Sequence, residues 1–222
     1  MKNLLRNNRG FIVLLLALAL FRTAVADWNP IPSGSMRPTL LEGDVVFVDR
    51  LAYDLKLPLT DIILARLNDP KRGDIVTFSS PSDRTRLIKR IIALPGDTVE
   101  MRGDVLIVNG MAAGYRFIGQ APESLAEGIT TTARRYEEKT VSGQHQIQTL
   151  DKVSARRDFG PVQVPPDHYL MLGDNRDNSA DSRYFGFVAR NLLIGRAERV
   201  LVSADIKGDW MPRLDRFGKA LN

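Results

Sequence analysis

Apolar residues along the chain come in short runs that are separated by glycine, proline, asparagine or aspartate. Such runs predict β-strands bounded by turns. We expect strands at residues 44–50, 74–80, 86–94, 98–102, 105–108, 162–164, 168–172 and 192–202. Gly103-Asp104 separates two of these runs and predicts a tight hairpin. Because this region has no long amphipathic pattern, it favours an all-β fold of curled antiparallel sheets.

Residues 113–160 differ from the rest, because they are more polar and less periodic. We interpret them as an inserted second β lobe, small and with weak strands. The main β domain then comprises residues 29–112 and 161–206, and residues 207–222 form a polar, basic tail. Residues 1–28 form a separate N-terminal segment.

This N-terminal segment has the composition of a membrane-targeting sequence. Lys2, Arg6 and Arg9 are followed by an almost purely apolar run at residues 11–21, which Arg22 interrupts. It is either a signal that is cleaved after Ala26 or an uncleaved anchor. A bilayer span needs about 20 apolar residues, so hydropathy alone slightly favours the cleaved signal. In both cases the positive-inside rule keeps the N-terminus in the cytoplasm and directs the rest outward.

Composition excludes several kinds of site. The chain has no cysteine and only two histidines, so thiolate chemistry is absent and a histidine zinc site is disfavoured. The net charge of +5 is compatible with nucleic acid, but no zinc-finger spacing, helix-turn-helix or aromatic RNA motif accompanies it. A basic face beside an anionic membrane explains the charge better. We therefore predict no metal, no cofactor and no nucleic-acid partner.

Three motifs carry candidate chemistry. In the first, at residues 30–40, prolines and a glycine shape a loop that can expose the hydroxyl of Ser35, although Ser-Gly-Ser alone is typical of a linker.

In the second, at residues 86–97, Lys89 shares a strand face with Leu87 and Ile91. Apolar surroundings lower the pKa of a lysine, and a neutral lysine can accept a proton from a serine. Alone, such a lysine is more typical of an edge strand that faces solvent.

The third motif is a dense polar loop at residues 173–186. Within it, Asp181 and Arg183 can form a buried ion pair, and Ser179 can hydrogen-bond to a neighbouring amine. The alternating acids suggest calcium, but Ser179 and Phe185 stand where an EF-hand loop needs glycine and glutamate. We therefore exclude a calcium loop.

Taken together and in order, the segments SGSMRPTL, RGDIVTF, KRIIALPGD and GDNRDNSADSRYFG resemble the conserved boxes of the type I signal peptidases. Ala93 departs from the glycine that is usual in that family. The resemblance implies that Ser35 is the nucleophile and Lys89 the general base. It also implies that the Ser33 hydroxyl and the Ser35 backbone amide form the oxyanion hole.

The same resemblance assigns supporting roles. Ser179 is expected to orient the lysine, and Asp181 with Arg183 to brace the site. Small apolar pockets would accept the Ala-X-Ala residues before the cleaved bond. The residues expected to line these pockets are Ile31, Pro32, Met36, Leu40, Leu87 and Ile88.

The resemblance also shifts the interpretation of the N-terminus toward a retained transmembrane helix that ends near Arg22. The expected protein is a single-pass enzyme of the bacterial inner membrane, with its catalytic domain on the extracytoplasmic side. It would remove signal peptides from exported preproteins, and its partners would be those signal peptides and membrane lipid.

Three alternatives remain open from the sequence. The chain could be a dedicated pilin or conjugation-system peptidase that uses the same Ser-Lys chemistry. It could be a Ser-His-Asp hydrolase that uses His168. It could also be an inactive, membrane-tethered scaffold that binds peptides.

Overall fold

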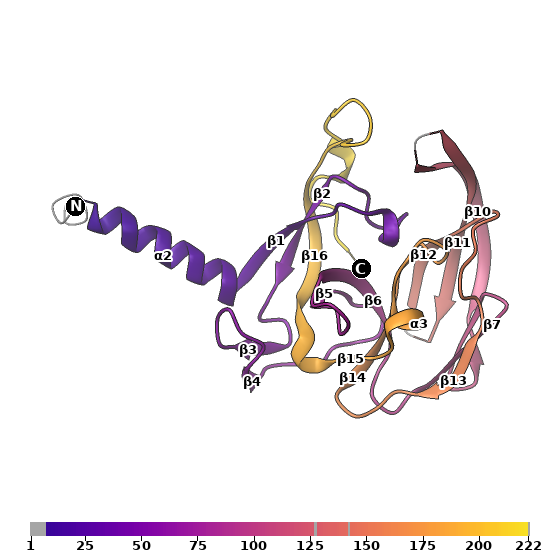
Figure 1. Ribbon diagram of the computed structural model, residues 1–222, viewed down its shortest axis with the longest axis horizontal. Helices are drawn as coiled ribbons and strands as arrows, with labels where there is room; N and C mark the ends of the chain where they lie inside the picture. Colours follow the sequence, from indigo (N-terminus) through magenta and orange to yellow (C-terminus); the bar gives the residue numbers. More distant parts are fainter. Residues whose placement is uncertain (1–7, 127, 142, 222) are drawn as a thin grey trace.

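The computed structural model describes residues 8–126, 128–141 and 143–221. Lys2 and Arg6 of the predicted cytoplasmic segment lie outside these residues. A single long helix projects from a body of β-sheets (Figure 1). The paired strands within every sheet are antiparallel, as the sequence predicts.

The largest sheet has seven strands in the order β1-β2-β16-β5-β6-β14-β15. Their bounds are β1 Ala26–Pro30, β2 Asp44–Asp49, β16 Leu193–Ser203, β5 Ile75–Ser79, β6 Arg86–Ala93, β14 His168–Leu172 and β15 Val188–Ala189. Helical turns η1 (Gly34–Met36), η2 (Arg190–Leu192) and α3 (Ser182–Phe185) interrupt its connections, and η3 (Leu214–Arg216) lies in the tail.

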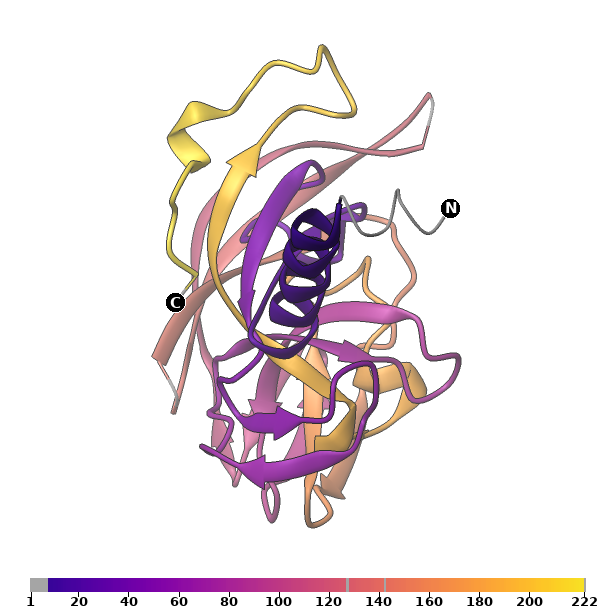
Figure 2. The same cartoon turned by 90° about the vertical axis from the view of Figure 1, so that its left-hand side faces the viewer.

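Two smaller sheets lie beside the main one (Figures 1 and 2). The first consists of β13 (Phe159–Gln163), β7 (Thr98–Arg102), β8 (Val105–Val108) and β9 (Met111–Ala112). The second consists of β10 (Gly114–Ala126), β11 (Ile129–Thr140) and β12 (Gly143–Leu150). A separate hairpin pairs β3 (Asp54–Lys56) with β4 (Ile63–Arg66).

The strands of the predicted second lobe are longer than their sequence suggests. β10 has 13 residues and β11 has 12, although their polar sequence gave only weak strand patterns. The reason is that β11 buries few side chains, chiefly Ala133 and Glu138, so its apolar periodicity is faint. The division of the chain into domains at residues 112 and 161 stays a proposal.

Strand β6 is the element that most shapes the site. Its residues from Lys89 to Ala93 are all buried. Ile91 packs in one apolar cluster, Ile92 and Ala93 pack in another, and Ile88 packs against a third. Burial on both faces explains why the apolar residues of this segment form a continuous run and do not alternate with polar ones. Lys89 and Arg90 are the two cations within that run.

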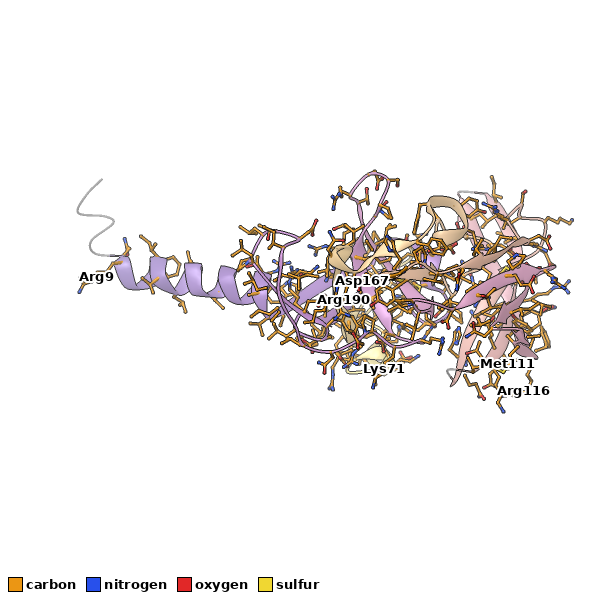
Figure 3. All side chains as sticks on the ribbon, turned by 90° about the horizontal axis from the view of Figure 1, so that it is seen from below. Arg9, Lys71, Met111, Arg116, Asp167 and Arg190 are labelled. Carbon is orange, nitrogen blue, oxygen red and sulfur yellow. The ribbon has the colours of Figure 1, made fainter. Side chains whose placement is uncertain are left out.

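The N-terminal helix α2 (Arg9–Ala24) extends away from the sheets, with Arg9 at its far end (Figure 3). Its apolar side chains Phe11, Val13 and Leu14 are exposed. Among the described residues no helix is both long and apolar enough to cross a membrane, so the predicted transmembrane helix is not supported. The physical reason is length, since its 16 residues rise by about 24 Å against a hydrocarbon core of about 30 Å.

Candidate active site

The fold brings Ser35 and Lys89 into direct contact. Ser35 lies in the short helical turn η1, and Lys89 lies in the buried part of β6. The Lys89 Nζ and Ser35 Oγ atoms are 2.6 Å apart, and Nζ also donates to the Ile88 carbonyl at 3.0 Å. At this distance a proton can pass directly between the hydroxyl and the amine.

Burial changes the acidity of this lysine. Lys89 is 2% exposed, and loss of hydration lowers its pKa from 10.5 to about 8. The carboxylates of Asp181 and Asp174 oppose this shift, and Arg183 adds to it. Near neutral pH some of the protein molecules therefore carry Lys89 as a neutral amine, which is able to accept a proton.

The loop that carries Ser35 is held from the polar loop at residues 173–186. The Asn175 backbone N–H donates to the Ser35 carbonyl at 3.1 Å, and its side-chain amide donates to the Gly34 carbonyl at 3.0 Å. Arg37, two residues after Ser35, forms ion pairs with Glu42 at 2.7 Å and with Glu123 of β10 at 2.9 Å. The sequence singled out neither Asn175 nor Glu123, because such contacts join segments far apart in the chain.

Ser33 lies next to the Ser35 hydroxyl. Its hydroxyl donates to Ser35 Oγ at 3.5 Å and is exposed to the cleft side of the loop. The Ser35 backbone N–H belongs to the first turn of η1, where amides lack partners inside the turn. A hydroxyl and a backbone amide at one end of a helical turn are the donor types that stabilise an oxyanion.

Asp181 and Arg183 form the buried ion pair that the sequence suggests. Arg183 Nε and Nη2 donate to the two Asp181 oxygens, each at 2.8 Å, and both side chains are almost fully buried. Asp181 also accepts from the backbone amides of Gly173 and Arg183, and so caps α3. The pair therefore fixes the shape of the polar loop behind Lys89.

Ser179 does not make the contact that the resemblance implies. Its hydroxyl is buried and has no hydrogen-bond partner within the part of the chain that the structure describes, Lys89 included. It lies against Gly173, where an added Cβ would come within 2.2 Å of Ser179 Oγ and 2.5 Å of the Ser35 carbonyl oxygen. Gly173 is thus required by the close approach of two neighbouring segments.

A cleft of about 250 Å³ opens beside the Ser35–Lys89 pair. Of the six predicted pocket residues, Ile31, Pro32, Leu87 and Ile88 line it. Met36 and Leu40 do not, because both are fully buried in the apolar core behind the loop. Asn29 and Arg86, which the sequence analysis did not select, line the cleft as well.

Two buried ion pairs hold the polar loop, one to strand β6 of the main sheet and one to strand β11 of the three-stranded sheet. Arg90 of β6 binds both carboxylate oxygens of Asp174 at 2.9 and 2.7 Å, and Arg176 binds both of Glu138 at 2.9 and 2.6 Å. His145 lies between them, 3.3 Å from Glu138 and 3.9 Å from Asp174. Pairing with Arg176 and His145 holds the pKa of Glu138 well below its usual value despite burial.

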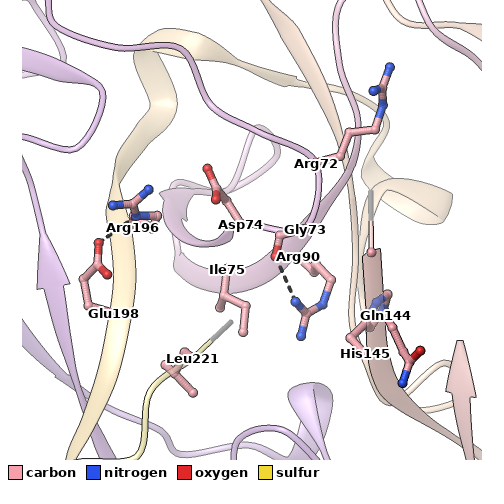
Figure 4. A pocket seen from close by; sticks show the side chains of 11 residues that line it. Arg72, Gly73, Asp74, Ile75, Arg90, Gln144, His145, Arg196, Glu198 and Leu221 are labelled. Atoms are coloured by element: carbon pink, nitrogen blue, oxygen red, sulfur yellow. Dashed lines mark hydrogen bonds and ion pairs between the residues drawn. The ribbon is translucent and has the colours of Figure 1, made fainter. Parts of the chain in front are cut away.

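A second, larger cleft of about 370 Å³ lies away from the dyad and contains His145 and Gln144 (Figure 4). Its arginines are already engaged: Arg90 with Asp174 and the Gly73 carbonyl, Arg72 with Asp97, and Arg196 with Glu198. Among the described residues that line this cleft there is no serine. Size alone therefore does not make this cleft the better candidate.

His168 is not placed for a Ser-His-Asp mechanism. It lies at the start of β14, and its Nδ1 is 2.8 Å from the Pro166 carbonyl. The described residues give it no hydrogen bond to a serine or to a carboxylate. The hydrogen bond to Pro166 is a local contact that shapes the turn before the strand.

Comparisons with known proteins match most of the chain. A family model described as "Signal peptidase, peptidase S26" matches residues 5–202. Signal peptidase I of Pseudomonas fluorescens is 34% identical over 97% of this chain and 78% of its own length. That of Pseudomonas aeruginosa is 35% identical with the same coverage. A crystal structure of a signal peptidase I from Enterococcus faecalis V583 is 33% identical over 59% of this chain and 97% of that chain, with a TM-score of 0.35.

Proposed function

The chain belongs to the signal peptidase family, peptidase S26, and from that premise we propose that this type I signal peptidase cleaves preproteins with Ser35 as nucleophile and Lys89 as general base. The observation that carries the proposal is the 2.6 Å contact between Ser35 Oγ and the buried Lys89 amine. Incubation of a preprotein with wild-type, Ser35→Ala and Lys89→Met protein tests it.

The proposed reaction proceeds in two stages. Neutral Lys89 takes the proton of the Ser35 hydroxyl as Oγ attacks the scissile carbonyl carbon. The tetrahedral intermediate collapses to an acyl-enzyme, and Lys89 returns the proton to the departing amine of the mature protein. Lys89 then deprotonates a water, which attacks the ester carbonyl carbon. As the bond to Ser35 Oγ breaks and the signal peptide leaves, Lys89 returns the proton to Oγ and restores the hydroxyl.

The cleft supports a preference for small apolar residues before the cleaved bond. Ile31, Leu87 and Ile88 give it an apolar wall next to the nucleophile. An extended substrate places every second side chain on the same face, about 7 Å apart, so two alternate residues can enter one such cleft. We propose that these are the alanines of an Ala-X-Ala sequence.

Ser33→Ala is expected to lower kcat by about 10²-fold with little change in KM. Loss of one oxyanion donor removes about 3 kcal/mol of stabilisation that exists only in the transition state. Steady-state kinetics on a signal-peptide substrate measure the change. Ser33→Thr, which keeps the hydroxyl, should retain more activity than Ser33→Ala, and equal activity of all three proteins would contradict the role.

Gly173→Ala is expected to lower kcat/KM by about 10²-fold, because the new Cβ forces Ser179 and the Ser35 backbone apart, and displacements near 1 Å have that effect on catalysis. Gly114→Ala is the matched control, since nothing lies within 4 Å of its added Cβ. Both variants are compared by substrate cleavage and by thermal unfolding. Equal activities of the two variants would show that Gly173 is not a packing requirement of the site.

We further propose that the N-terminal segment holds the enzyme on the membrane and that the catalytic domain lies on the extracytoplasmic side. The exposed apolar surface of α2 and the basic residue Arg9 at its start support this. Flotation of the full chain with phosphatidylcholine vesicles tests the attachment. Protein that stays at the bottom of the gradient would contradict it.

A further inference from the structure

An arginine cluster surrounds one buried carboxylate where α2 meets the main sheet. Asp27, the second residue of β1, accepts from Arg22 Nε at 3.0 Å and from Arg86 Nη1 at 2.9 Å, and Arg50 Nη1 lies 3.7 Å away. The Asp27 side chain is 5% exposed. A single carboxylate cannot neutralise three guanidinium groups, so this junction carries an excess of positive charge.

Of these three arginines, Arg50 has the weakest contact with Asp27. Its side chain is only 15% exposed, yet its sole ion-pair partner in the described chain is Asp27, beyond hydrogen-bond distance. Burial, together with the nearby charge of Arg86, lowers the pKa of Arg50. A mostly buried guanidinium with unused donors is the kind of group that an anion stabilises.

Two of these three arginines border a pocket of about 260 Å³. Arg50 and Arg86 contribute to its wall, together with Thr23 of α2 and Thr60 and Asp61 of the β3–β4 connection. The acid Asp61 is already paired with Arg84 at 2.8 Å. The charged residues of the wall are therefore two arginines and one aspartate that already has its own partner, which leaves the pocket basic.

The position of the pocket indicates the source of the anion. It lies where the apolar helix ends, since Thr23 is in the last turn of α2. Leu59, on its rim, is 86% exposed, and Trp28 is 45% exposed beneath the Arg22 guanidinium, 4.3 Å from the ring centroid. Exposed leucine, interfacial tryptophan and arginine are the residues that proteins place at the level of lipid headgroups. Figure 1 shows the β3–β4 hairpin close to the end of α2 nearest the sheets.

We propose that this pocket binds the phosphate of an anionic phospholipid headgroup, with Arg50 and Arg86 as its donors. The proposal rests on the membrane attachment proposed above. Arg86 also lines the substrate cleft, so a lipid held here would lie directly beside the bound signal peptide. The site would thus set the height and orientation of the catalytic cleft at the membrane surface.

The test measures binding without substrate. Full-length protein in a neutral detergent is titrated with dihexanoyl phosphatidylglycerol, with dihexanoyl phosphatidylcholine or with inorganic phosphate, and the thermal unfolding midpoint is recorded. Wild-type protein should be stabilised by phosphatidylglycerol, and Arg50→Gln should need at least tenfold more of it for the same shift. The matched control is Arg116→Gln on β10, at the end of the molecule opposite Arg9 (Figure 3), which should respond as wild type.

A second variant guards against a folding defect of Arg50→Gln. Thr60 is an exposed pocket residue, and Thr60→Glu adds a negative charge there that should weaken binding similarly. Equal titrations of wild type and both pocket variants would overturn the site, and an equal shift with inorganic phosphate would overturn the lipid assignment. Ser35→Ala should bind phosphatidylglycerol normally, so failure of the catalytic proposal and failure of this one appear in different measurements.

Discussion

Lys89→Met is expected to lower kcat/KM for preprotein cleavage by about 10⁴-fold, because it removes the base that activates Ser35 and leaves the fold intact. Methionine keeps most of the side-chain volume in a site that is 2% exposed. Lys89→Arg should be equally inactive, since arginine stays protonated at any working pH. Cleavage of a preprotein, followed by gel or mass spectrometry, measures the loss.

The stability of the same variant separates catalysis from folding. The pKa of Lys89 in the folded protein, about 8, lies below its value of 10.5 in an unfolded chain. Below pH 8 the native state therefore bears the cost of a buried charge, and Lys89→Met should unfold at the same temperature as wild type or higher. His168→Ala is the activity control and should retain cleavage. An active Lys89→Met protein, or an inactive His168→Ala protein, would refute the assignment of the base.

Arg90→Met is expected to destabilise the protein by about 3–5 kcal/mol, because it leaves the Asp174 carboxylate buried without its partner. The Arg90–Asp174 pair is almost completely buried, at 2% and 1% exposure. Arg66→Met is the matched control, since it breaks an Arg–Asp pair whose members are 55% and 56% exposed, and it should cost at most about 1 kcal/mol. Chemical denaturation gives both free energies of unfolding.

A double variant tests the reason for the loss. Arg90→Met combined with Asp174→Leu removes the orphaned charge and should recover part of the stability. Equal, small losses in Arg90→Met and Arg66→Met would mean that water reaches Asp174 and that the pair does not hold the polar loop. The hydrogen bonds from Asn175 to the Ser35 segment would then have to position Ser35 without help from this ion pair.

Local patterns in the sequence were sufficient to predict much of the fold. The strands at residues 98–102, 105–108 and 168–172 coincide with β7, β8 and β14. Gly103 and Asp104 both have positive φ, as the two-residue hairpin requires. Each of these features depends on neighbours in the chain, which is why periodicity and turn residues identify them.

Features that depend on distant contacts were not predictable in this way. Asn175 looks like any residue of a polar loop until the fold places it against Gly34 and Ser35. Met36 and Leu40 follow Ser35 closely in sequence, but Met36 at the end of the helical turn and Leu40 beyond it both pack in the core, away from the cleft. The Glu138–Arg176 pair joins the inserted strands to the polar loop and has no local signature.

The pH dependence of kcat/KM tests the central claim, a neutral Lys89 acting on Ser35, most directly. This profile reports the pKa of the essential base in the free enzyme. The account predicts that log kcat/KM rises with a slope of one from pH 6 and levels off around an apparent pKa of about 8, the value that burial imposes on Lys89. A profile that is flat across this range, or that breaks near the pKa of an ordinary histidine, would contradict it.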